Sequence, residues 1–150
     1  MDPVLPVDII VQCTNTINKV MIALDIGNGD LFASCFARDG LITIYINGTR
    51  KSGRFEISQL AKSLHEKFKD CKHWEGNISL WPAKDFESTK QVRNLSYWKA
   101  MQGGDCISTG IHDDILEQFE GQWMIKARTI YHTWTKAGGP IELPNFWDQL

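Results

Sequence analysis

The stretch KVMIALDIGNGDLFASCFARDGLITIYINGTRKSGRFEI, residues 19–57, decides the predicted fold. Three segments in it are expected to be strands: 19–26 alternates apolar and polar residues, 31–37 places Phe32 and Phe36 on one face, and 41–46 is rich in β-branched residues. Each of these segments ends at a turn sequence, namely Gly27-Asn28-Gly29, Arg38-Asp39-Gly40 and Asn47-Gly48. A fourth segment, 49–57, is polar and suits the edge of a sheet. The stretch therefore predicts an antiparallel β-meander of three to four strands.

An amphipathic helix is expected directly after the meander, at residues 58–70. Its apolar residues recur at helical spacing: Ile57, Leu60, Ala61, Leu64 and Phe68. Ser58 can cap the first turn by accepting a backbone N–H bond. This helix would cover one face of the meander.

The rest of the chain predicts both helices and strands. A short strand is expected at 77–81, and a long strand rich in β-branched and aromatic residues at 122–135. Apolar spacing predicts two further helices, at 85–101 and 111–121. No repeat, linker or low-complexity segment interrupts the sequence. We therefore expect one α+β domain over residues 1–150: a meander packed against an amphipathic helix, with two further helices and a long C-terminal strand.

Composition narrows the classes of function. The chain has 150 residues, of which 43% are hydrophobic and 23% charged, with a formal net charge of −2. This is typical of a globular domain and gives no general attraction to nucleic acid. The cysteines form no Cys-x-x-Cys pair, which argues against a zinc ribbon or a redox motif. Without a secretory signal or a membrane-length apolar run, we expect an intracellular protein with no membrane partner.

Asp25 ends the first predicted strand and precedes the glycine-rich turn. The order of strand, turn, two strands and helix over about residues 20–70 resembles the start of ribonuclease H-like and resolvase-type nucleases. The resemblance implies that Asp25 holds a catalytic Mg²⁺, with Asp113 and Asp114 as further ligands, because Mg²⁺ prefers hard oxygen ligands. The next strand, Ile78-Ser79-Leu80-Trp81, lacks the acid those nucleases carry there. The alternative is that Asp25 flanks a turn and the other two acids stabilise a helix start.

The beginning of this stretch also resembles the phosphate-binding start of sugar kinases and actin. In those proteins the turn faces a phosphate. A chain of 150 residues is too short for their two-lobed fold, so this resemblance does not extend further.

One face of the predicted strand 122–135 carries basic residues between apolar and aromatic ones. It comprises Met124, Lys126, Arg128, Ile130, His132 and Trp134. A second basic cluster comprises Arg50, Lys51 and Arg54. Cations for phosphates and rings for base stacking suit single-stranded nucleic acid, so a nucleic-acid-binding module is one interpretation. The other is an ordinary solvated face, with the second cluster protecting an edge strand from aggregation.

His65, Cys71 and His73 lack the spacing and the fourth ligand of a zinc site. Cys106 follows Gly103-Gly104-Asp105, where a thiolate could be stabilised, but no oriented base accompanies it. Outside the nuclease alternative, the sequence therefore assigns no catalytic residue, no metal ligand and no cofactor, and it favours a protein that is not an enzyme.

Six tryptophans are many for this length: Trp74, Trp81, Trp98, Trp123, Trp134 and Trp147. A buried indole N–H needs a partner, so some of these rings are expected at the surface. Phe146 and Trp147 near the C-terminus could pack on another subunit. We therefore predict a non-enzymatic binding or assembly module that binds a protein partner or itself through exposed aromatics, ahead of the nucleic-acid-binding and nuclease alternatives.

Overall fold

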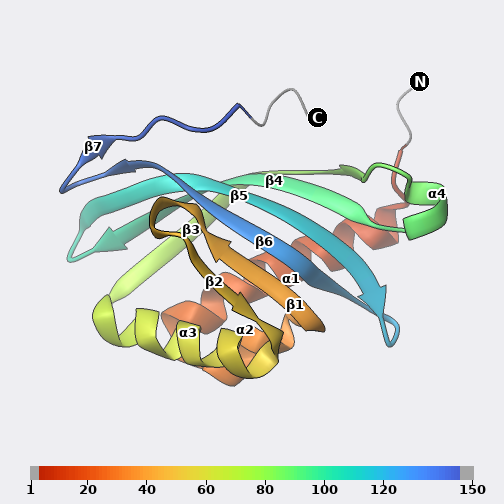
Figure 1. Ribbon diagram of the computed structural model, residues 1–150, viewed down its shortest axis with the longest axis horizontal. Helices are drawn as coiled ribbons and strands as arrows, with labels where there is room; N and C mark the ends of the chain where they lie inside the picture. The colour runs from red at the N-terminus through yellow and green to blue at the C-terminus, as the bar shows by residue number, and fades with distance from the viewer. Residues whose placement is uncertain (1–3, 146–150) are drawn as a thin grey trace.

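The computed structural model describes residues 4–145, which form one curved sheet with helices on one side (Figure 1). The main helices are α1 (Val7–Asp25), α2 (Gly29–Ser34) and α3 (Gly53–Lys67). The strands are β1 (Phe36–Ile44), β2 (Thr49–Ser52), β3 (Cys71–Pro82), β4 (Val92–Gln102), β5 (Asp105–Phe119), β6 (Gln122–Thr135) and β7 (Gly139–Pro140). Two short helices lie between strands: η1 (Tyr45–Asn47) and α4 (Phe86–Thr89).

The sheet is mixed. Within the described residues its seven strands run in the order β2-β1-β6-β5-β4-β3, with β7 beside β6. β1 and β6 are parallel, and the other pairs are antiparallel. The predicted fold, an antiparallel meander of three to four strands with two further helices and one long C-terminal strand, is therefore wrong. Most of the sheet comes from the second half of the chain, and much of the expected meander is helical.

Helix α1 occupies the range in which the first strand is expected. Its buried residues follow a helical stripe that begins well before residue 19: Cys13, Ile17, Val20, Met21 and Ala23. In the segment 19–26, Ile22 and Ile26 are more than half exposed, so the alternating apolar residues do not form one buried face. The predicted turn at Gly27 exists, but it joins α1 to α2 rather than two strands.

Strands β4 and β5 occupy the ranges expected to be helices, 85–101 and 111–121. In β4 the buried positions include Asn94, Ser96, Trp98 and Ala100, which alternate with exposed Tyr97 and Lys99. In β5 the buried face includes Gly110, His112, Asp114 and Leu116. Polar residues at buried positions hide the two-residue period of a strand, so the remaining apolar residues mimic helical spacing.

The sheet curves over the helices (Figure 1). The strand pairing is irregular at several points, such as Gly76/Ser79 in β3 and Thr109/Gly110 in β5. Such bulges increase the local twist of a sheet. Apolar residues of α1, α2 and α3 fill one end of the concave side, with Phe32, Phe36 and Ile57 buried there. In residues 4–145, the helices are too short or too polar to span a membrane.

Candidate functional site

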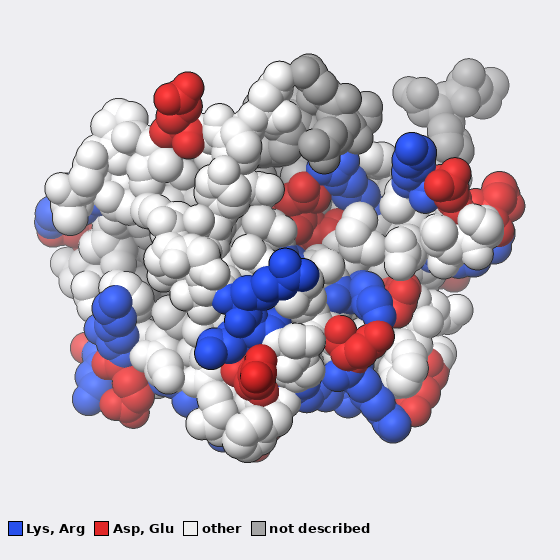
Figure 2. Space-filling model, viewed as in Figure 1, with Lys and Arg blue, Asp and Glu red and all other residues white. Residues whose placement is uncertain are grey.

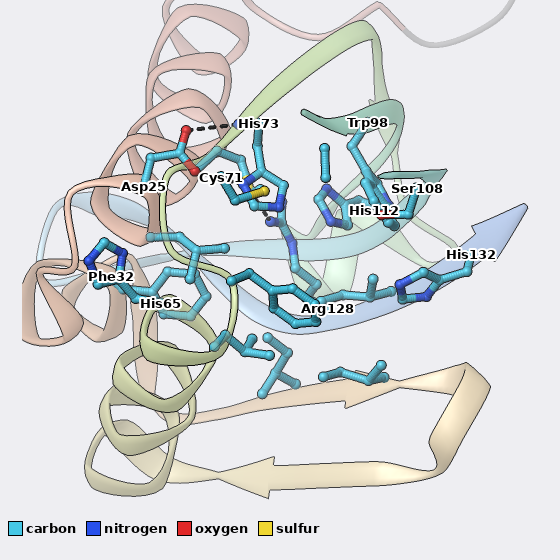
Figure 3. A pocket seen from close by; sticks show the side chains of 18 of the residues that line it. Asp25, Phe32, His65, Cys71, His73, Trp98, Ser108, His112, Arg128 and His132 are labelled. Carbon is cyan, nitrogen blue, oxygen red and sulfur yellow. Dashed lines mark hydrogen bonds and ion pairs between the residues drawn. The ribbon is translucent and has the colours of Figure 1, made fainter. Parts of the chain in front are cut away.

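A partly enclosed cavity of about 120 Å³ lies between α1, α2, α3 and the concave face of the sheet (Figure 3). Its wall is mostly apolar, with side chains such as Leu24, Phe32, Ile42 and Leu64. The sequence has four histidines, and all of them line this cavity: His65, His73, His112 and His132. Titratable groups in an otherwise apolar concave site are the usual mark of a functional centre.

Asp25 and His73 form a hydrogen-bonded pair at the cavity wall (Figure 3). Asp25 is the last residue of α1, and its Oδ1 lies 2.6 Å from Nδ1 of His73 on β3. Its Oδ2 accepts the backbone N–H of His73 at 2.8 Å. The side chains are 12% and 16% exposed, respectively. With Nδ1–H donated to the carboxylate, Nε2 is the ring nitrogen that can accept a proton, which is the arrangement of a general base.

The turn after Asp25 depends on Gly27, whose φ is +74°. A Cβ at this position would lie 2.6 Å from Cδ2 of His65. Asn28 then begins α2, because its Oδ1 accepts the backbone N–H of Leu31 at 2.9 Å. The glycine lets α1 end against α3, which brings His65 to the cavity beside the Asp25 pair.

This cavity brings together the three residues considered as a zinc site in the sequence, His65, Cys71 and His73. Burial, and to a smaller extent the charge of Asp25, raises the pKa of the Cys71 thiol. Cys71 is therefore an uncharged thiol in the wall at neutral pH. Among residues 4–145, no group of three or more His, Cys, Asp or Glu side chains is placed to hold a metal ion.

Arg128 supplies the positive charge of the site from β6. Its side chain is 1% exposed and makes two hydrogen bonds to Asp114, Nε to Oδ1 at 2.7 Å and Nη2 to Oδ2 at 2.8 Å. Burial disfavours the charge, but Asp114 outweighs it and the pKa of Arg128 is raised. Within residues 4–145, the one hydrogen-bond acceptor of Arg128 Nη1 is the Met21 sulfur, at 3.5 Å. Since sulfur is a weak acceptor, this N–H group retains donor capacity for a ligand.

A buried polar network continues from Arg128 across the concave face to β3. Asn94 Nδ2 donates to Asp114 Oδ2 at 2.9 Å and to Ser96 Oγ at 3.0 Å. Ser96 Oγ donates to Glu75 Oε1, which also meets His112 Nδ1 at 2.7 Å. Four neighbouring strands thus contribute to one chain of hydrogen bonds, which holds the cavity floor in a single arrangement.

The ionisation of the network follows from its partners. Burial alone would raise the pKa of Glu75, but His112, Arg128 and the hydrogen bond from Ser96 outweigh it and lower the pKa to about 2. Burial, and then the charge of Arg128, lowers the pKa of His112, although Glu75 opposes this. At neutral pH Glu75 is therefore a carboxylate and His112 a neutral imidazole that donates Nδ1–H to it.

The three acids of the nuclease interpretation do not share a metal site. Asp25 is paired with His73, and Asp114 with Arg128. Asp113 is adjacent to Asp114 on β5 and points to the opposite face of the sheet, where its Oδ2 lies 2.8 Å from Nη2 of Arg93.

The residues of the predicted basic face are separated in the structure. Lys126 bonds to Asp39 near the surface, whereas Arg128 is buried and His132 lines the cavity. Trp134 is partly buried on β6, opposite Pro140 of β7. On the face shown in Figure 2, Lys and Arg side chains lie beside Asp and Glu side chains rather than in one continuous patch.

The second basic cluster is also divided. Arg50 and Lys51 lie on β2, paired with β1. Arg54, in the first turn of α3, donates Nε–H to the Phe36 carbonyl at 3.0 Å. Phe146 and Trp147, expected to contact another subunit, lie outside the described residues.

Sequence reasoning missed the polar concave face. Cys71, His73 and Glu75 stand at every second position of β3, and His112 and Asp114 do so on β5. This two-residue spacing is a readable signal, but it marks one face only if both segments are recognised as strands.

Comparison with known proteins identifies the fold. The sequence matches the SnoaL-like domain over residues 7–129. Similar solved structures include LinA, with a TM-score of 0.74 and 21% identity, covering 92% of this chain and 96% of that one. A candidate scytalone dehydratase from Novosphingobium aromaticivorans gives 0.72 and 18%, covering 92% and 91%. ActVI-ORFA from Streptomyces coelicolor gives 0.71 and 18%, covering 85% and 96%. Among curated proteins, no significant match was found.

These comparisons overturn the function predicted from the sequence. The prediction of a non-enzymatic partner-binding module, with a nucleic-acid-binding module and a nuclease as alternatives, is wrong: the chain matches the SnoaL-like domain, and the similar structures include LinA and a candidate scytalone dehydratase. Buried polar side chains such as Arg128 and His112 line a cavity of small-molecule size. Matched over residues 7–129, the chain belongs to the SnoaL-like family.

Proposed function

We propose that this protein is a lyase that removes a proton from the carbon next to a carbonyl group and eliminates a β-hydroxyl as water. The observation that carries the proposal is the His73–Asp25 pair, fixed by two hydrogen bonds at the wall of an apolar cavity. An imidazole that a carboxylate orients through its other nitrogen is suited to accept a proton from a substrate.

The reaction needs one base and one leaving group. His73 Nε2 takes the proton from the α-carbon, and the electrons of that C–H bond form the new C=C bond. The C–O bond at the β-carbon breaks with its electron pair on oxygen. The imidazolium of His73 returns the proton to the departing hydroxyl, so the products are an enone and water and the protein is unchanged. Asp25 stabilises the transient imidazolium and holds the ring in its tautomer.

Arg128 has the chemistry to stabilise the intermediate charge. When the α-proton leaves, negative charge develops on the carbonyl oxygen. Nη1 of Arg128 has only the Met21 sulfur as a partner among the described residues, and the guanidinium lines the same cavity. A fixed donor in a site of low polarity is worth more than the same donor in water. The pair with Asp114 keeps the guanidinium from turning away.

The size of the cavity supports a small cyclic substrate. An engineered cavity of about 150 Å³ binds benzene, and this one measures about 120 Å³ and is partly open. A single six-membered ring therefore fits, and an open side leaves space for substituents. The similar structure described as a candidate scytalone dehydratase is in keeping with an elimination of water.

The test is dehydration of 3-hydroxycyclohexanone to 2-cyclohexenone, followed by the ultraviolet absorbance of the enone. We expect turnover by the wild type and a loss of about 10²–10⁴-fold in His73→Ala, the usual contribution of a general base. The matched control is Asp30→Asn, which removes a carboxylate at the start of α2 that bonds to Ser58 outside the cavity wall. Equal rates for wild type and His73→Ala, or no rate above buffer, would refute the proposal.

A further inference from the structure

His112 lines the cavity and forms a second histidine–carboxylate pair with Glu75, and the elimination does not use this pair. His112 and Glu75 have side chains that are each 2% exposed, with His112 Nδ1 2.7 Å from Glu75 Oε1. Because Nδ1–H is donated to the carboxylate, Nε2 of the neutral ring is an acceptor. This nitrogen has no hydrogen-bond partner among residues 4–145 that would occupy it.

Two further polar atoms near His112 are buried without partners. His132 Nδ1 and Trp98 Nε1 make no hydrogen bond within the described part of the chain. The Trp98 ring stacks on His112 at 5.7 Å and meets the edge of His132 at 5.0 Å between centroids. Buried polar groups are normally paired, so orphans grouped at one cavity point to a ligand. Ser108, also buried, adds a hydroxyl to this part of the wall.

These groups lie away from the Asp25 pair. In Figure 3, His132 and Ser108 stand on the side of the cavity opposite Asp25, Phe32 and His65. The Trp98 ring lies next to both groups, 6.4 Å from the His73 ring and 5.0 Å from the His132 ring between centroids. A ring held between the two sides would present one edge to His73 and the other to His112 and His132.

The charges around His112 and His132 determine which kind of ligand group can bind beside them. Burial, and to a lesser extent His112, lowers the pKa of His132, so both imidazoles are neutral at pH 7. Glu75 and Asp114 carry two negative charges against the one positive charge of Arg128. A carboxylate or phosphate therefore finds no charged partner at His112 and His132, whereas a neutral hydroxyl can donate to an imidazole and accept from the indole or Ser108.

We propose that His112, His132, Trp98 and Ser108 form a hydroxyl-binding subsite, so that the substrate is a ring carrying a hydroxyl group on the side opposite the carbon that His73 deprotonates. This inference rests on the proposed elimination for the role of His73. It adds the substrate class: a hydroxylated cyclic compound rather than a plain or an anionic one.

The test compares phenol with toluene, two rings of nearly the same shape, by NMR titration of the wild-type protein. An apolar cavity without a polar partner favours toluene, because the phenol hydroxyl loses water without replacement. We expect phenol to bind about fivefold more tightly or better, the factor for one neutral hydrogen bond. We also expect the ¹⁵N resonance of His112 Nε2 to shift with phenol and not with toluene.

Two matched histidine variants locate the subsite. His132→Phe should abolish or reverse the phenol preference, whereas His65→Phe, on the opposite side of the cavity, should retain it. His112→Phe is not a suitable variant, because it would leave the Glu75 carboxylate buried without its histidine partner. A wild type that binds toluene as tightly as phenol, or binds neither compound at millimolar concentration, overturns the inference. So does a phenol preference unchanged in His132→Phe.

The two proposals fail separately. His73→Ala should keep the phenol preference while losing dehydration. A phenol preference without any dehydration by the wild type refutes the proposed elimination alone. Dehydration that depends on His73, without a phenol preference, refutes the hydroxyl subsite alone.

Discussion

Replacement of Arg128 by methionine tests whether the floor of the cavity is held by one buried ion pair. The Arg128 side chain is 1% exposed and that of Asp114 is 0% exposed. Arg128→Met keeps most of the side-chain length but removes both hydrogen bonds to Asp114, which then retains a single side-chain donor, Asn94 Nδ2. Breaking a buried pair from one side costs about 3–5 kcal/mol, because the remaining charge is left without compensation. We expect a loss of this size in the free energy of unfolding.

Urea unfolding at pH 7 measures the loss, and an unchanged slope with urea would show that only stability has changed. The chain offers a close control, since Arg93 and Asp113 form a similar pair on the opposite face, with side chains 13% and 18% exposed. Water can reach Asp113 there, so Arg93→Met should cost about 1–2 kcal/mol. If Arg128→Met costs no more than Arg93→Met, the reasoning about the floor is wrong. Adding Asp114→Leu to Arg128→Met should recover part of the loss, because it removes the stranded charge.

Three other perturbations test individual contacts of the site. Asp25→Asn should lower the rate of 3-hydroxycyclohexanone dehydration by about 10²-fold or more with little change in KM, because the imidazolium loses its counter-charge; an unchanged rate would contradict this. Folding lowers the pKa of Glu75 from 4.5 to about 2. The ionised Glu75 therefore adds roughly 3 kcal/mol to the free energy of unfolding above pH 4.5, and this stabilisation is lost as the pH falls towards 2. Urea unfolding at several pH values in that range measures the loss. Gly27→Ala should lower the free energy of unfolding by about 1–2 kcal/mol because of its positive φ, and by a further amount because the new Cβ would clash with His65. Gly48→Ala is the control for the backbone effect alone, since Gly48 has φ +70° and no atom within 4 Å of an added Cβ. Equal losses in the two variants would mean that the His65 side chain moves aside without cost.

Some elements can be predicted well from the sequence, and the reasons are local. β6 covers the range 122–135 in which a strand is expected, because β-branched and aromatic residues are dense there. α3 overlaps the predicted helix 58–70 but begins at Gly53, five residues earlier. The glycine-rich turn at 27–29 is also located correctly, since positive φ at Gly27 is a property of the residue itself.

The elements that the sequence pattern misses are those that build the site. β4 and β5 bury Asn94, His112 and Asp114, so their hydrophobic pattern is broken where a strand would show it. Those side chains are tolerated only because partners on neighbouring strands satisfy them, and such partners are distant in sequence. Local pattern and global fold disagree here because the concave face holds the cavity, which is where such conflict is expected.

Only part of the candidate site can be predicted from the sequence. The pattern around Asp25 singles it out, but as a metal ligand, because its partner His73 is 48 residues away. Arg128 and His132 are predicted on an exposed basic face, although the structure directs both to the cavity. Only the pairing of α1 with β3, a tertiary contact, joins an acid and an imidazole into a base.

The most direct measurement of the central claim is exchange of the α-hydrogens of cyclohexanone for deuterium in buffered D₂O, followed by ¹H NMR. This reaction needs the base and the cavity but no leaving group. Catalysis by the wild type should exceed that of His73→Ala by about 10²-fold or more, with Asp30→Asn close to the wild type. Equal exchange with wild type and His73→Ala would mean that the Asp25–His73 pair is not the base.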